Sequence, residues 1–234
     1  MKKEELAYSI IYTNRKTVSI CINRDGSVSV RAPSFVRESE IHQIIQQKMD
    51  WIIKKQNQLI DKSQLAHTKY HRNYDENSTM PLQGKEYPLR FIKFTGLKIP
   101  VVSFEQDYFQ VRYGEYDKQK IKAAFVSWYM KKAKLVYMER IALYQAIIKE
   151  PFGYVRIKEQ KSCYGSCSSK RNLNFNWKCI LAPKEILDYI VVHELCHLKE
   201  MNHSKQFWAE VANVYPNYKE CKRWLRENNV YFEI

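Results

Sequence analysis

Residues 118–149 carry the feature that most restricts the fold, a long run of apolar side chains at helical spacing. Side chains three and four residues apart lie on one face of an α-helix, so this run predicts one long helix with a broad apolar face. The apolar positions are Ile121, Phe125, Trp128, Tyr129, Ala133, Val136, Ile141, Tyr144 and Ile148. Pro151 and Gly153 end the helix. Such a face must be covered by a second layer of structure.

The rest of the chain supplies strands and shorter helices. Runs rich in β-branched and aromatic residues predict strands at 6–12, 17–22, 27–32, 87–94, 98–104, 108–113, 154–159 and 173–177. The three strands between residues 87 and 113 follow one another through short turns, which predicts a meander. Apolar periodicity predicts further helices at 38–62, from Pro183 to near Met201-Asn202, from Ser204 to Val214, and after Pro216.

These elements together predict an α+β fold with two parts. A β-rich N-terminal region with one helix would occupy residues 1–115, and a helix–sheet–helix domain would occupy residues 116–234. The Ser, Cys and Gly residues between the last two predicted strands indicate a loop.

The chain is strongly basic, with 39 lysines and arginines against 25 acidic residues and a formal net charge of +14. A charge of this size attracts anionic partners such as nucleic acid, nucleotides or acidic protein surfaces, without identifying which. A lysine-rich solvated surface with no specific partner is the alternative.

Nothing in the sequence indicates a membrane or an export route. No window approaches 18 uninterrupted apolar residues, which a membrane span requires. Residues 1–5 begin no apolar signal sequence. We therefore expect a cytoplasmic protein with no membrane partner, whose six cysteines are reduced thiols.

The segment His193-Glu194-Leu195-Cys196-His197 carries the chemistry. Residues four apart on a helix share a face, so the imidazoles of His193 and His197 can bind one metal ion. Glu194 is rotated by about 100°, which places its carboxylate beside the ion, within reach of a metal-bound water. Two imidazoles favour zinc over magnesium or calcium. The alternative is an amphipathic helix whose histidines only contact solvent or form hydrogen bonds.

His203 is the candidate third ligand. It follows His197 by six residues, just beyond the predicted helix end. Asn202 tolerates the left-handed conformation that turns a chain back after a helix. Three histidines would leave one position on the ion open for water, which is typical of a catalytic rather than a structural zinc site. Taken alone, His203 could instead be a surface residue.

Several motifs together resemble the YgjP-like metallopeptidase-domain family, which is related to the WLM and SprT-like zinc peptidases. They are Tyr164–Ser169, Leu173–Trp177, Leu181–Pro183, the histidine segment through Asn202-His203-Ser204, and Phe207-Trp208. The N-terminal basic hairpin, Gly84–Leu89 and Val155–Lys158 also fit, so the resemblance covers most of the chain. This chain has Cys163-Tyr164 where the family usually has Arg-Trp, and Glu200 where metzincins have glycine.

The resemblance implies a minimal zincin-like domain, with His193, His197 and His203 as zinc ligands and Glu194 as the catalytic base. A zinc ion held by neutral histidines lowers the pKa of a bound water toward about 7. Glu194 would then take a proton as this water attacks a peptide carbonyl and deliver it to the leaving amine. The substrate would be a peptide or protein.

Two other functions stay open. The same metal site in a basic protein could hydrolyse a phosphoanhydride, which would make the protein a metal-dependent nucleotide pyrophosphatase. The protein could also be a nucleic-acid-associated module with a structural zinc ion. Structural zinc sites normally have four protein ligands, and Cys196 points away from the face shared by the two helical histidines.

Residues around this segment have less certain roles. Tyr164 could donate a hydrogen bond to the reacting oxygen or serve in packing. Leu173–Trp177 could be an edge strand that pairs with an extended peptide, or an internal strand. Phe207 and Trp208 are expected to pack behind the metal. A basic cluster on the last helix would be a solvated face or hold an anionic partner; it comprises Lys219, Lys222, Arg223 and Arg226.

Overall fold

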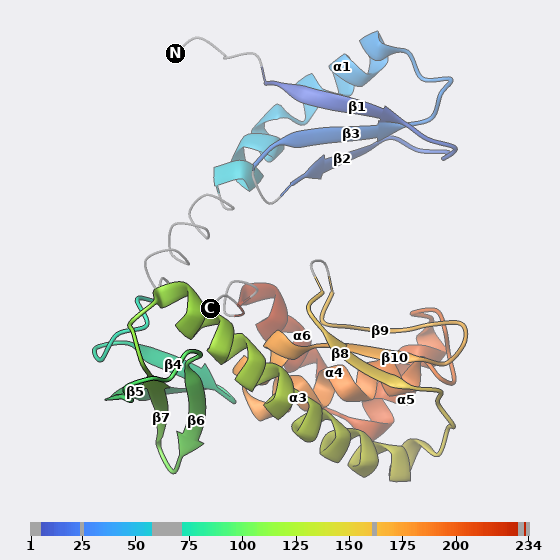
Figure 1. Ribbon diagram of the computed structural model, residues 1–234. Helices are drawn as coiled ribbons and strands as arrows, with labels where there is room; N and C mark the ends of the chain where they lie inside the picture. The colour runs from blue at the N-terminus through green and yellow to red at the C-terminus, as the bar shows by residue number, and fades with distance from the viewer. Residues whose placement is uncertain (1–5, 24–25, 58–71, 161–162, 229–231, 233–234) are drawn as a thin grey trace. The chain divides into compact units, whose positions relative to one another are not determined.

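A computed structural model describes residues 6–23, 26–57, 72–160, 163–228 and 232 (Figure 1). The chain divides into two compact units, residues 1–69 and residues 70–234. Each unit has its own hydrophobic core. The predicted α+β class is confirmed, because helices and sheets occur in both units.

The first unit packs a three-stranded sheet against one helical segment. The elements are β1 (Tyr8–Tyr12), β2 (Ser19–Ile22), β3 (Val28–Ala32) and α1 (Glu38–Gln47). The strand order is β1-β3-β2, with β3 parallel to β1 and antiparallel to β2. Val28, Val30 and Ala32 alternate toward the same core as Ile41 and Ile45 of α1. Helical backbone resumes at 49–57, and the rest of the helix predicted over 38–62 lies outside the described residues.

A four-stranded sheet opens the second unit, in the order β4-β5-β7-β6. Its strands are β4 (Thr79–Leu82), β5 (Lys85–Lys93), β6 (Val101–Glu105) and β7 (Tyr108–Tyr113). The prediction of a meander was wrong, because β5 pairs in parallel with β7 and β6 lies on the other side of β7. The central position suits β7, whose Phe109 and Val111 are fully buried. β4 was not predicted, since Pro81 interrupts it, and proline is tolerated there because β4 is an edge strand.

The predicted long helix is α3 (Lys118–Ile148). Asp117 caps it by accepting hydrogen bonds from the backbone N–H groups of Gln119 and Lys120. The ring of Phe109 on β7 contacts Phe125 and Tyr129 of α3, with ring centroids 5.5 and 5.9 Å apart. The first sheet and α3 therefore share one core. The division expected between residues 115 and 116 runs through this core, whereas the compact units divide near residue 70.

The second sheet of this unit has three short strands. They are β8 (Val155–Lys158), β9 (Gly165–Cys167) and β10 (Leu173–Asn176), in the order β8-β10-β9. β10 is the central strand, parallel to β8 and antiparallel to β9. The idea that β10 is an edge strand was therefore wrong. The edge strands are β8 and β9, and the sequence indicated β9 as a loop because Gly-Ser-Cys has little intrinsic strand preference.

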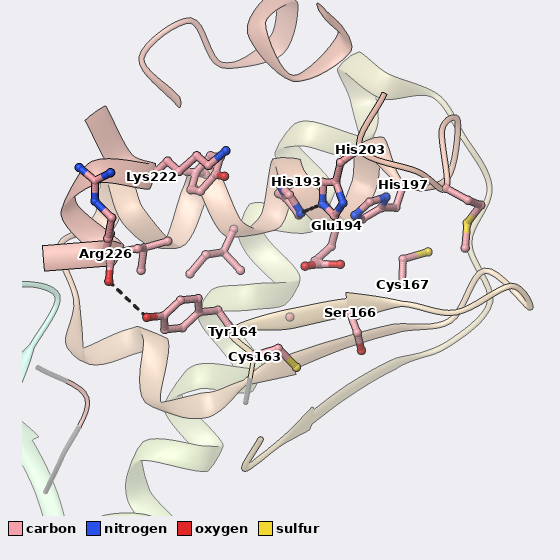
Figure 2. A pocket seen from close by; sticks show the side chains of 15 residues that line it. Cys163, Tyr164, Ser166, Cys167, His193, Glu194, His197, His203, Lys222 and Arg226 are labelled. Atoms are coloured by element: carbon pink, nitrogen blue, oxygen red, sulfur yellow. Dashed lines mark hydrogen bonds between the residues drawn. The ribbon is translucent and has the colours of Figure 1, made fainter. Parts of the chain in front are cut away.

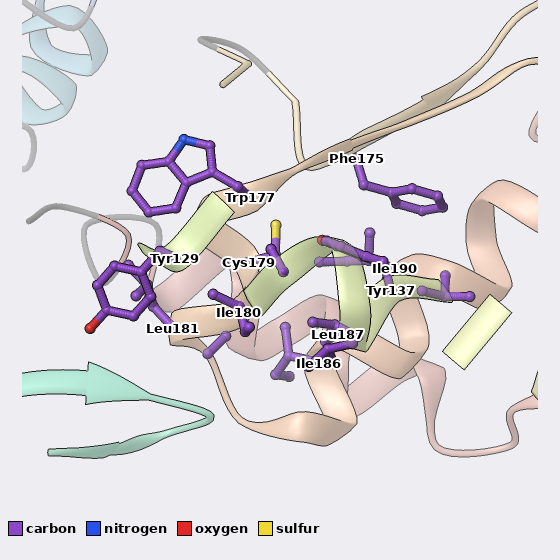
Figure 3. Packing of buried hydrophobic residues seen from close by; sticks show 14 of the residues in the cluster. Tyr129, Tyr137, Phe175, Trp177, Cys179, Ile180, Leu181, Ile186, Leu187 and Ile190 are labelled. Atoms are coloured by element: carbon purple, nitrogen blue, oxygen red, sulfur yellow. The ribbon is translucent and has the colours of Figure 1, made fainter. Parts of the chain in front are cut away.

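The remaining elements are one 3-10 helix and three α-helices. They are the 3-10 helix η1 (Trp177–Leu181), α4 (Lys184–Cys196), α5 (Lys205–Val214) and α6 (Tyr218–Glu227). The predicted helices that follow Pro183 and Ser204 are thus confirmed. Figure 3 shows the core that joins η1 and α4 to α3, in which Tyr129 stacks on Trp177 and Tyr137 stacks on Phe175.

An ion pair also joins α3 to α4. Arg140 donates two hydrogen bonds to the carboxylate of Asp188, at 2.5 and 2.9 Å, and both side chains are largely buried. This bidentate contact anchors α4 to α3 at Asp188, five residues before His193. Within the described residues, no helix has the length and apolar character that a membrane crossing requires.

Candidate metal centre

The C-terminal turn of α4 presents two of the candidate ligands. His193 is half-buried and His197, at the C-cap, is buried, while Glu194 between them is 5% exposed. Ile190, Val191 and the other apolar residues of α4 enter the core, which holds the polar face of the helix end toward a pocket. His193 and His197 therefore lie on one face of α4, as their four-residue spacing predicts.

The third histidine reaches this face from the segment before α5. Ser204 caps α5 by accepting a hydrogen bond from the N–H of Phe207 at 3.1 Å, and its own N–H donates to the carbonyl of Asn202 at 2.8 Å. These bonds hold His203 between them. Asn202 is not among the described residues with a positive φ, so the expected left-handed turn was wrong. The chain turns back through the cap of α5 instead.

Three imidazoles converge at this point (Figure 2). One ring nitrogen each of His193, His197 and His203 lie within 4.8 Å of one another. The Nε2 atoms of His193 and His203 are 3.0 Å apart. The Nδ1 atom of His197 lies 3.0 Å from the carbonyl oxygen of Glu200, a contact that fixes the ring and leaves its Nε2 available. Of the described residues, these three form the one such cluster of candidate ligands.

The geometry and chemistry of the three histidines suit a zinc ion. Zinc–nitrogen bonds of about 2.0–2.1 Å at tetrahedral angles separate two ligand nitrogens by about 3.3 Å, close to the observed 3.0 Å. Burial, helped by the other two histidines, lowers the pKa of His193 to about 3. Burial also lowers the pKa of His197. Neutral imidazoles are the form that binds metal, so these shifts keep two of the candidate ligands free of a competing proton near pH 7.

Aromatic rings hold the three histidines in place. Phe207 is fully buried, and its ring centroid lies 4.4 to 4.9 Å from those of His193, His197 and His203. Trp208 stacks on His203 with centroids 5.7 Å apart. The prediction that Phe207 and Trp208 pack behind the histidines is confirmed.

Glu194 lies beneath the histidines with an unsatisfied oxygen. Burial raises the pKa of its carboxyl group to about 8, and its buried Oε2 has no hydrogen-bond partner in the part of the chain that the structure describes. A buried carboxylate oxygen without a partner is costly unless a ligand or cation completes its surroundings. This unpaired oxygen is a second observation that fits a metal ion and its bound water at the histidines.

Gly165 makes room for Glu194, and the sequence did not single it out as a functional residue. A Cβ atom at position 165 would lie 2.7 Å from both Cγ and Oε1 of Glu194, closer than real contacts allow. Edge strand β9 thus passes directly against the carboxylate, which only glycine permits. The Gly-Ser-Cys motif was visible in the sequence, but the contact that explains its glycine was not.

The histidines and Glu194 open into a cavity of about 770 Å³. β9 forms one wall and α6 another, with Lys222 and Arg226 on the α6 wall (Figure 2). The Tyr164 hydroxyl, just before β9, donates a hydrogen bond to the carbonyl of Leu225 on α6 at 3.4 Å. Its ring also contacts Phe232, with centroids 5.2 Å apart. These contacts favour the packing role for Tyr164 over a role at the reacting oxygen.

Comparison with protein-family models shows to which family the chain belongs. The family model described as YgjP-like, metallopeptidase domain, matches residues 16–228. The chain belongs to the YgjP-like family. The match includes the three clustered histidines, Glu194 and the glycine of β9, so this YgjP-like protein is of the metallopeptidase type.

Two solved structures resemble parts of the YgjP-like chain. One is the metallopeptidase zymogen of Pyrococcus abyssi abylysin, at 26% identity and a TM-score of 0.37, covering 40% of this chain and 95% of that one. The other is the metallopeptidase zymogen of Methanocaldococcus jannaschii jannalysin, at 24% identity and a TM-score of 0.36, covering 40% and 96%. No curated protein matches the chain.

Proposed function

We propose that this YgjP-like protein is a zinc metallopeptidase that hydrolyses peptide bonds in the cytoplasm. The observation that carries the proposal is the convergence of His193, His197 and His203 within 4.8 Å, directly above the buried carboxylate of Glu194. A reducing compartment suits the chain, because all six cysteines are free thiols.

The three histidines would hold zinc through one nitrogen each. The ion would supply a water of lowered pKa, near about 7, and would stabilise negative charge on the carbonyl oxygen under attack. Glu194 would accept the proton of the attacking water and deliver it to the leaving amine. Burial makes this carboxylate a stronger base than usual, and a neighbouring cation would keep it ionised near neutral pH.

Edge strand β9 would bind the substrate backbone. Its partner β10 occupies one side, so the backbone groups of β9 on the other side can pair with an extended peptide. Gly165 brings this edge against Glu194, so a peptide paired with β9 would pass over the carboxylate.

The experiment combines metal analysis with a single substitution. We expect about one zinc ion per chain in the wild-type protein and hydrolysis of a peptide library. Glu194→Gln should retain zinc and lose at least about 100-fold in kcat, since it removes the general base while keeping the size of the side chain. Glu185→Gln, an exposed position at the start of the same helix, is the matched control and should hydrolyse peptides as the wild type does.

The same samples separate the alternative functions. Nucleoside triphosphates tested beside the peptides address the pyrophosphatase alternative, and DNA binding at several salt concentrations addresses a nucleic-acid partner of the basic surface. Hydrolysis of triphosphates without any peptide hydrolysis would contradict the proposal. Unchanged peptide hydrolysis by Glu194→Gln would also contradict it.

A further inference from the structure

The α6 wall of the pocket carries positive charge close to the metal centre. Lys222 and Arg226 are one helical turn apart, so both side chains lie on the face of α6 that lines the cavity. Figure 2 shows them at the end of the pocket away from Cys167. The one acidic side chain that lines this pocket, among the described residues, is the buried Glu194.

Lys222 is held in position by an aromatic ring. Its ammonium nitrogen lies 4.1 Å from the centroid of the Trp208 ring, a cation–π contact. No carboxylate of the described residues forms an ion pair with it, although the side chain is exposed. An oriented cation that forms no ion pair with a described carboxylate can bind an anionic ligand group.

The distance from Lys222 to the histidines sets where such a group would lie. The Trp208 centroid is 5.8 Å from that of His193, so the ammonium lies within about 10 Å of the His193 ring. An extended peptide advances about 3.3–3.6 Å per residue. A carboxylate bound by Lys222 would thus belong to a residue within about three positions of the bond being cleaved.

We propose that Lys222, supported by Arg226, forms a carboxylate-binding subsite that selects peptides with a negative charge close to the cleaved bond. The proposal rests on the proposed peptidase function and names its substrate class. The carboxylate can come from an aspartate or glutamate side chain or from the C-terminus of the peptide. Arg226 contributes less, because its side chain is 77% exposed and a neighbouring Glu227 carboxylate lies 3.8 Å away.

Binding of four matched peptides to the zinc-loaded Glu194→Gln protein tests the subsite without hydrolysis. The peptides share one uncharged sequence and carry either glutamate or glutamine near the centre, with either a free or an amidated C-terminus. We expect the charged member of at least one pair to bind about fivefold more tightly, which equals about 1 kcal/mol. The pair that shows the difference identifies the source of the carboxylate.

Substitution of Lys222 should remove this difference. In Lys222→Met, placed in the same Glu194→Gln background, the preferred charged peptide should bind about as weakly as its neutral counterpart. Lys222→Glu should reverse the preference and favour a peptide with lysine at the same place. Lys219→Met is the matched control, because Lys219 lies one turn earlier on α6 and does not line the pocket. It should retain the preference.

Three outcomes would overturn the proposal. One is equal binding of all four peptides by the parent protein. Another is a charge preference that persists in Lys222→Met or disappears equally in Lys219→Met. The third is an effect of Lys222→Met on the binding of inorganic triphosphate with none on peptides, which would indicate a phosphate site. Failure of the peptidase function has a different signature, since wild-type protein would then cleave no peptide while charge-dependent binding persisted.

Discussion

The absence of a side chain at Gly165 lets strand β9 lie directly against Glu194, the proposed general base. Because a Cβ at residue 165 would lie 2.7 Å from two atoms of Glu194, Gly165→Ala must push the carboxylate or strand β9 aside. A displacement of about 1 Å at a reacting group can cost about 100-fold in rate. We expect kcat/KM for peptides to fall by about 10- to 100-fold, with zinc content unchanged. Steady-state kinetics and metal analysis of the variant measure both.

Gly96→Ala is the control for this effect. Gly96 also lacks a side chain, but a Cβ there would meet nothing within 4 Å, and its φ of +87° makes alanine unfavourable. This variant should lose unfolding free energy, by about 1 kcal/mol, and keep the wild-type kcat/KM. Full activity in Gly165→Ala would show that the close approach of β9 does not position Glu194.

Residue spacing in the sequence was sufficient to find the histidines but not their surroundings. The four-residue interval between His193 and His197 predicts a shared helix face, because helical geometry alone fixes it. The approach of His203, the contact between Gly165 and Glu194, and the stack of Lys222 on Trp208 depend on how separate elements pack. No local pattern encodes such contacts.

At the level of elements, the cap of α5 determines where His203 stands. Ser204→Ala removes the hydrogen bond from the N–H of Phe207, and loss of such a cap costs about 1 kcal/mol of unfolding free energy. His203 immediately precedes the cap, so we also expect zinc affinity to fall, by up to about tenfold. Chemical denaturation and zinc titration of the purified variant measure the two effects.

Asn217→Ala provides the comparison for the α5 cap. Asn217 occupies the N-cap of α6 but makes no side-chain capping hydrogen bond. Its substitution should therefore change stability little and zinc affinity not at all. If Ser204→Ala bound zinc as tightly as the wild type did, His203 would not depend on this cap.

Helices were predicted more accurately than strand pairing. Local signals, such as the apolar periodicity of α3, Pro183 before α4 and Ser204 before α5, specify where helices begin and end. The pairing of β5 with β7 and the existence of β9 depend on partners distant in the sequence. Short segments such as Gly165–Cys167 become strands only because a neighbouring strand binds them.

For the whole molecule, the division near residue 70 predicts which fragment folds. A fragment of residues 70–234 contains one complete core and should unfold cooperatively and hydrolyse peptides. A fragment of residues 116–234 lacks Leu89, Phe109 and Val111, which cover α3. Each such side chain contributes about 1.5–3 kcal/mol, and a domain has only about 5–15 kcal/mol in total. We expect this shorter fragment to aggregate or remain unfolded.

Circular dichroism during thermal unfolding distinguishes the two fragments. Equal stability of both would show that the first sheet and α3 do not depend on each other.

The change from strands to helices after Gly114 suggested a boundary at this point, but a change of secondary structure need not be a change of core. Phe109 and Phe125 lie on opposite sides of the expected boundary and contact each other.

The edge beside Glu194 is only three residues long, from Gly165 to Cys167. So short a strand offers few backbone groups, and a chain can use them only where it is already extended and not engaged in its own helix or sheet. A well-folded protein substrate would have to unfold locally before a segment of it could pair with β9. Exposure of such a segment, in a damaged, nascent or intrinsically unstructured chain, would then limit the rate of cleavage.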